Sequence, residues 1–249
     1  MASKLYNLGC SFAYGNCVPT RNKLGNEHRG PGTYVAEHLG YEEINLACNG
    51  NSIDGILRRL YTDKFETGSI ILIGVPPASR FQIVNNHQEI VYNKVRAGKS
   101  SWGADDEAQH CIKHAFTKGP HRDNDWFLSY KWPEINDRKL EKKMDINETA
   151  SYLLYFNLAK IQTRIRYQLG LEYYIYNSVG FNYKPHNEET IYLKSMVDLS
   201  NYYQPETDMF SLVKTDTKYE LAEGDQHPNH LAYKVWSDGF CKWLEGKKK

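Results

Sequence analysis

The chain has 249 residues, which fits one large α/β domain or two small ones and is enough to bury a sizeable core. Its 31 basic and 30 acidic residues nearly balance, which excludes an overall charge argument for binding nucleic acid or an anionic membrane. No apolar run approaches the ~20 residues of a membrane-spanning helix, and the first residues lack the apolar core of a signal peptide. Five scattered cysteines without a Cys-x-x-Cys pair indicate reduced thiols, so we expect a cytoplasmic protein (in the host cytoplasm if it is viral).

The first 75 residues predict strands and helices in alternation. In chain order these are a strand at 4–9, a helix at 31–39, a strand at 41–47, a helix capped by Ser52 and a strand at 69–74. The polar stretch 12–30 predicts a long loop, whereas the unbroken apolar run at 69–74 is typical of a strand buried on both faces. A β-α-β-α-β order predicts a mostly parallel sheet with helices on its faces.

The regular pattern breaks over residues 80–145. This stretch carries three tryptophans and many charges, and we expect it to be an insertion after strand three that covers the functional site. Within it, Phe81–Val84 and Glu89–Tyr92 predict a hairpin. We expect the whole chain, 1–249, to form a single domain.

Regular elements return after the insertion. They are a helix that starts near Asp145 with Glu148 in a capping-box pattern, a strand at Leu171–Asn177, a short helix at 188–197 and a final helix from about Pro228. The apolar positions expected on one side of the final helix are Ala232, Val235, Trp236, Phe240 and Leu244.

Three segments carry residues suited to acyl transfer. Ser11 follows the first strand, at the carboxyl edge where open α/β sheets bind ligands. His227 precedes Pro228, which favours an extended backbone, and Asp225 two residues earlier then points to the same side as the imidazole. Gly50 precedes a helix N-terminus, where free N–H groups can hold an oxyanion. These residues predict a hydroxyl nucleophile, a base with its supporting acid, and an oxyanion hole.

The same segments resemble a known family. Gly9-Cys10-Ser11-Phe12 resembles the Gly-Asp-Ser-Leu block of the SGNH (GDSL-type) hydrolases, residues 45–50 resemble their second block, and residues 225–229 resemble their last block. The resemblance implies a flavodoxin-like three-layer α/β/α fold and a serine esterase. It also implies that Ser11 is the nucleophile, His227 the base and Asp225 its support. The N–H groups of Gly50 and Ser11 would then form the oxyanion hole.

Two departures from that pattern concern the site. Cys10 replaces the usual Asp of the first block, and we expect it to pack inward as a small apolar residue. The third block, Gly-x-Asn-Asp in the family, reads Gly-Val-Pro-Pro at residues 74–77, so an oxyanion donor is missing. Asn177, Ser79 and Arg80 are candidate substitutes or substrate-binding residues. A Gly-Cys-Ser-Phe block with an arginine after strand three also resembles SGNH-like proteins of phage genomes.

Other functions remain open. His110 and His114 have a spacing that zinc sites use, but no Glu follows the first histidine as a zinc-protease motif requires, and we expect neither a metal nor another cofactor. The main alternative to an esterase is a non-catalytic binding or structural protein that retains the SGNH fold. For the esterase we expect a small-molecule or carbohydrate ester, such as an O-acetyl sugar, as substrate, while lipid esters and thioesters stay open. We expect no nucleic acid or membrane partner.

Overall fold

A computed structural model describes residues 3–15, 29–47, 51–76, 80–84, 127–131, 146–178, 185–205, 208–219 and 227–247; for 80–84 and 127–131 it describes the backbone only. In this part of the chain, five parallel strands form one sheet in the order β2-β1-β3-β6-β7. The strands are β1 (Lys4–Leu8), β2 (Glu42–Asn45), β3 (Ile70–Val75), β6 (Glu172–Asn177) and β7 (Tyr202–Tyr203). This is the flavodoxin-like order, in which the strand sequence reverses beside β1 and ligands bind at the carboxyl edge.

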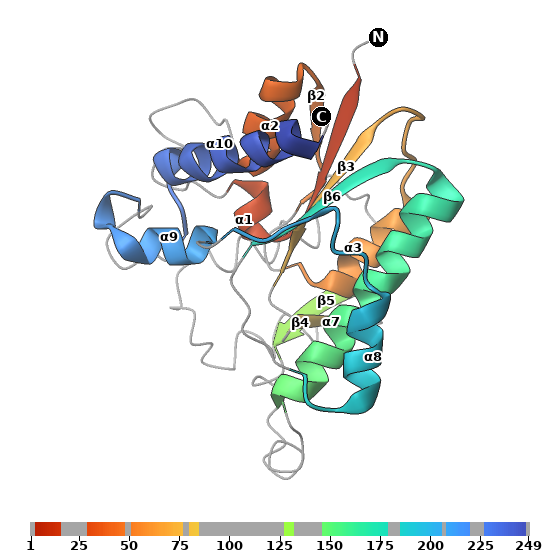
Figure 1. The fold of residues 1–249 in the computed structure, drawn as a ribbon. Coiled ribbons are helices and arrows are strands. Elements are labelled where there is room, and N and C mark those ends of the chain that lie inside the picture. Colours follow the sequence, from red (N-terminus) through yellow and green to blue (C-terminus); the bar gives the residue numbers. More distant parts are fainter. Residues whose placement is uncertain are drawn as a thin grey trace.

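Helices cover both faces of the sheet, as Figure 1 shows. On one face lie α2 (Pro31–Leu39) and α10 (His230–Lys247), which contact each other, and α9 (Met209–Thr215) packs against α10. On the other face lie α3 (Ile53–Thr62) and α7 (Ile146–Thr163), with α8 (Glu188–Met196) packed on α7. The fold is therefore a three-layer α/β/α arrangement, as predicted. None of the described helices combines the length and apolar character that crossing a bilayer requires.

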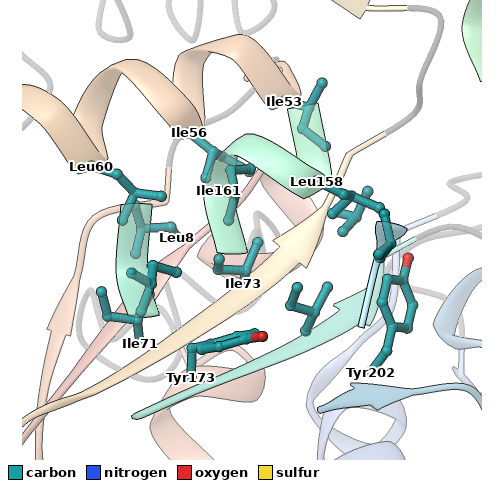
Figure 2. Packing of buried hydrophobic residues seen from close by; sticks show 14 of the residues in the cluster. Leu8, Ile53, Ile56, Leu60, Ile71, Ile73, Leu158, Ile161, Tyr173 and Tyr202 are labelled. Carbon is teal, nitrogen blue, oxygen red and sulfur yellow. The ribbon is translucent and has the colours of Figure 1, made fainter. Parts of the chain in front are cut away.

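The core consists of two apolar layers, one on each side of the sheet. Alternate strand residues supply each layer, because successive side chains of a strand point to opposite faces. Figure 2 shows the layer under α3 and α7, in which Leu8, Ile71, Ile73, Ile53, Ile56, Leu60, Leu158 and Ile161 are buried together. The layer under α2 and α10 contains Leu5, Leu72, Tyr174, Tyr176, Trp236 and Phe240. Both apolar layers extend to the carboxyl edge of the sheet, so the loops at that edge adjoin packed core side chains.

Local signals account for most helix boundaries. α2 begins at Pro31 and ends at Gly40, whose φ of 69° is the left-handed conformation that glycine adopts without strain. α3 follows Ser52, whose side chain accepts a hydrogen bond from the Gly55 N–H at 3.3 Å. α7 continues as a π-helical turn, Arg164–Leu169, up to Gly170.

Three details differ from the prediction. The expected loop 12–30 begins with a short helix, α1 (Ser11–Tyr14), because Gly15 adopts φ 80° and closes one turn. The strand at β4 (Arg80–Val84) pairs antiparallel with β5 (Phe127–Lys131), which also alternates apolar and polar residues; the expected partner Glu89–Tyr92 lies outside the described residues. Val235 is exposed, since the buried stripe of α10 runs through Ala232, Trp236 and Phe240.

The remaining residues of the expected insertion, including its three tryptophans, lie outside the described residues. That this stretch covers the site stays a prediction, as does the assignment of 1–249 to one domain. His110 and His114 also lie outside the described residues.

Candidate active site

Ser11 stands at the first position of α1, immediately beyond the carboxyl end of β1. Gly9 makes this turn possible, since a Cβ there would lie 2.4 Å from the Ala13 Cβ and 2.7 Å from the Gly74 carbonyl oxygen. Cys10 is buried in the apolar layer under α10, as its replacement of an acidic residue led us to expect. The serine is only 6% exposed, so its hydroxyl is held within the structure rather than displayed on a mobile surface loop.

His227 reaches the same point from the other end of the chain. Its Nε2 atom lies 3.0 Å from the Ser11 Oγ atom, within hydrogen-bond distance. The imidazole ring also lies against the Phe12 ring, with 5.0 Å between the centroids and 31° between the planes. The structure thus brings together a hydroxyl and an imidazole that the sequence separates by 216 residues.

Asn229, two residues after His227, anchors this segment of the chain through three hydrogen bonds. Its side-chain oxygen accepts a hydrogen bond from the Ala232 N–H at 3.1 Å, which caps α10. Its amide donates to the Lys218 carbonyl at 2.6 Å, and its backbone N–H donates to the Tyr219 carbonyl at 2.9 Å. We expected Pro228 to be the first residue of the helix, and this was wrong. Asn229 performs the capping and α10 begins at His230.

His230, the other histidine near the start of α10, has a different environment. Partial burial lowers the pKa of its imidazole, and the positive charge of Arg29 lowers it further. Its backbone carbonyl accepts a hydrogen bond from the Tyr34 hydroxyl at 3.5 Å. Among the described residues, the imidazole in contact with the Ser11 hydroxyl is that of His227.

A half-buried carboxyl group lies behind the Ser11 turn. Glu43 of β2 accepts hydrogen bonds from the Thr33 hydroxyl at 2.7 Å and from the Asn7 amide at 3.1 Å. Burial raises the pKa of this carboxyl, and the two hydrogen bonds only partly oppose the effect. Asn7 in turn donates to the Ala13 carbonyl of α1, so the Glu43 carboxyl group is linked to the turn that carries Ser11.

The other predicted site residues have different positions. Asn177 ends β6, and its side-chain oxygen accepts a hydrogen bond from the Tyr202 hydroxyl. The backbone of Arg80 begins β4. Asp225, Gly50 and Ser79 lie outside the described residues, so their assigned roles stay predictions.

Polar side chains that surround the turn at Ser11 were not predicted from the sequence. Asn7, Asn45 and Asn51 each donate to a carbonyl between Gly9 and Tyr14. A signal was present for Asn7, because an amide inside the apolar strand Leu5–Leu8 must find a buried partner.

Comparisons with known proteins find weak similarity to solved structures, including the two described here. No protein-family model and no curated protein matches the chain. Among solved structures, a phospholipase A1 from Streptomyces albidoflavus is 13% identical with a TM-score of 0.41, covering 99% of this chain and 100% of that one. A provisionally named acylhydrolase from Bacteroides fragilis is 12% identical with a TM-score of 0.31, covering 99% and 88%. Both sources are bacteria, so the phage resemblance stays a prediction. At these levels neither similarity carries an argument about activity.

Proposed function

We propose that this protein is an SGNH-type serine esterase, an acyl hydrolase with Ser11 as nucleophile and His227 as general base. The observation that carries the proposal is the 3.0 Å separation of the Ser11 Oγ and His227 Nε2 atoms at the carboxyl edge of a parallel sheet. A serine hydroxyl is a weak nucleophile until an adjacent base can accept its proton. An imidazole nitrogen at hydrogen-bond distance is the group that most often does so.

In the first half of the reaction, Nε2 of His227 accepts the Ser11 proton while Oγ forms a bond to the carbonyl carbon of the ester. The carbonyl electron pair moves to oxygen, and the N–H groups of Ser11 and Gly50 would hold the resulting oxyanion. The imidazolium then donates its proton to the alkoxy oxygen as the carbon–oxygen bond breaks. The alcohol leaves and the acyl group stays on Ser11.

In the second half, His227 accepts a proton from water, and the hydroxide oxygen bonds to the acyl carbon. Collapse of this intermediate breaks the bond to Oγ, which regains its proton from the imidazolium. Asp225, two residues before the base, would hold the Nδ1 proton so that Nε2 faces the serine. For the missing third donor, Asn177 is the candidate whose side chain is described; Ser79 and Arg80 remain alternatives.

For the substrate we propose an ester of a small molecule or carbohydrate, such as an O-acetyl sugar. The tryptophans of the expected insertion support this choice, because aromatic rings stack on sugar faces. A non-catalytic binding protein with the same fold is the alternative that the test below separates from the esterase.

The test is covalent labelling with a fluorophosphonate, followed by peptide mapping, together with hydrolysis of p-nitrophenyl acetate. Ser11→Ala should abolish both signals. Ser237→Ala is the matched control, since Ser237 is also buried but lies in the middle of α10. Folded wild-type protein that neither labels at Ser11 nor hydrolyses the ester would overturn the esterase and favour the binding protein.

A further inference from the structure

We infer that three asparagines, Asn7, Asn45 and Asn51, are positioning residues for Ser11. Each donates its side-chain amide to a backbone carbonyl of the turn that carries the proposed nucleophile. The inference deepens the proposed function and rests on it, because it assigns the positioning of the same serine to residues outside the catalytic set.

The three hydrogen bonds surround Ser11 on both sides along the chain. The Asn51 amide donates to the Gly9 carbonyl at 3.2 Å, two residues before the serine. The Asn7 and Asn45 amides donate to the Ala13 carbonyl at 2.8 Å and the Tyr14 carbonyl at 3.2 Å, two and three residues after it. The donors come from β1, the end of β2 and the segment before α3, so three parts of the fold converge on one turn.

The turn needs external donors because α1 is too short to hold itself. It has four residues, and isolated helices shorter than about 12 residues are marginal in water. Its own backbone bonds run from the Tyr14 N–H to the Cys10 carbonyl, at 2.9 Å, and from the Gly15 N–H to the Ser11 carbonyl. The last carbonyls of a helix have no partner within it, and here side-chain amides supply the partners.

The amides are themselves oriented by further bonds. The side-chain oxygen of Asn45 accepts from the Ala47 N–H at 3.1 Å, and that of Asn51 accepts from the Ser52 N–H at 3.0 Å. Since each oxygen is occupied by a backbone donor, the NH₂ end of each carboxamide faces the turn. The Asn7 side chain is oriented differently, by the hydrogen bond that its amide donates to the Glu43 carboxyl group.

This arrangement explains why the hydroxyl of Ser11 meets the base at 3.0 Å. A displacement of about 1 Å in a catalytic group can reduce the rate ~10²-fold. Loss of one positioning amide should therefore lower kcat, while KM, which reflects substrate contacts elsewhere, changes little.

The experiment compares Asn45→Leu and Asn51→Leu with Gln162→Met, each of which removes an amide but keeps a similar shape. Gln162 is the matched control, because its amide also binds a backbone carbonyl, that of Asp198 at 2.7 Å, but before β7 at the opposite edge of the sheet. Two quantities are measured in each protein: hydrogen exchange of the Tyr14 and Gly15 amides, and kcat and KM for p-nitrophenyl acetate.

In both leucine variants we expect exchange of these amides to accelerate at least ~10-fold and kcat to fall ~10- to 100-fold, with KM within ~3-fold. Gln162→Met should change neither quantity. The inference would be overturned if the Tyr14 and Gly15 amides exchanged at the wild-type rate in both leucine variants. It would also be overturned if Gln162→Met lost as much kcat as the leucine variants. If wild-type protein shows no activity, the proposed function fails, and hydrogen exchange alone decides whether Asn45 and Asn51 hold the turn. Asn45→Ser and Asn51→Ser replace any leucine variant that does not fold.

Discussion

Replacement of Gly74 by alanine tests the packing beneath the proposed site. Gly74 lies near the carboxyl end of β3, directly opposite Tyr176 in the sheet. A Cβ added to Gly74 would lie 2.6 Å from the Tyr176 hydroxyl oxygen, 2.8 Å from its ring carbon Cζ and 2.7 Å from the Ser178 Oγ atom. Since real Cβ atoms essentially never approach other heavy atoms within 3.0 Å, one of these groups must move.

The neighbours have little freedom to do so. Tyr176 and Ser178 are fully buried, and the Tyr176 ring packs against Trp236 with 4.6 Å between centroids and against Phe240 with 6.1 Å. Overpacking of this kind costs ~1–3 kcal/mol, and the loss of unfolded-state entropy on replacing glycine returns ~0.4–1 kcal/mol. We therefore expect Gly74→Ala to lose about 1–2 kcal/mol, which lowers Tm by roughly 2–8 °C in a chain of this size.

The assay is urea unfolding with thermal melts, and Gly246→Ala is the control. An added Cβ at Gly246 meets no atom within 4 Å, and its place in α10 favours alanine, so stability should stay constant or rise. Adding Tyr176→Phe to Gly74→Ala removes the nearest clashing atom and should recover part of the loss. If Gly74→Ala is as stable as Gly246→Ala, the reasoning from contact distances is refuted.

Three further predictions concern the site itself. His227→Gln should reduce fluorophosphonate labelling of the serine ~10²- to 10⁴-fold, whereas His230→Gln stays within ~3-fold; similar losses in both variants would contradict the choice of base. Phe12→Leu keeps apolar volume but removes the ring beside the imidazole, so kcat should fall ~2- to 10-fold and Phe12→Tyr should recover it; equal kcat in both variants would argue against the ring contact. Burial raises the pKa of Glu43, so folding favours its protonated form, and the wild type loses stability as pH rises from ~4.3 through the raised value. Glu43→Gln has no ionisable carboxyl group at this position and therefore does not show this loss. Urea unfolding should show that its free energy of unfolding, relative to that of the wild type, increases from about pH 4 to about pH 7. A difference that stays constant with pH would exclude the linkage.

The fold could be predicted where the pattern of residues has one strong interpretation. β3 follows from an unbroken run of apolar side chains, and the Pro31 and Gly40 boundaries of α2 follow from backbone chemistry; the structure confirms both elements. The two-residue strand β7 was missed, because Tyr202 and Tyr203 are too few to show a periodicity. α1 was missed for a related reason, since a four-residue helix shows no periodicity and its last carbonyls bind side chains of β1 and β2.

In the candidate site, too, some features could be predicted from the sequence and others could not. The places of Ser11 and His227 follow from the rule that ligands bind at the carboxyl edge of a parallel sheet. The structure has their side chains in contact, while their catalytic roles remain proposals. Asn7 could have been selected from its place inside an apolar strand, but Asn45 and Asn51 could not, because an amide in a polar segment becomes informative only when its carbonyl partner is known.

The separation of Ser11 and His227 by 216 residues has a consequence for biosynthesis. At ~5–20 residues per second, a ribosome needs roughly 10–45 s to extend the polypeptide from one to the other. During that interval Ser11 has no imidazole beside it, so in the proposed mechanism the nascent protein cannot attack esters. Ester hydrolysis would therefore begin only after His227 and α10 have emerged from the ribosome and docked on the sheet.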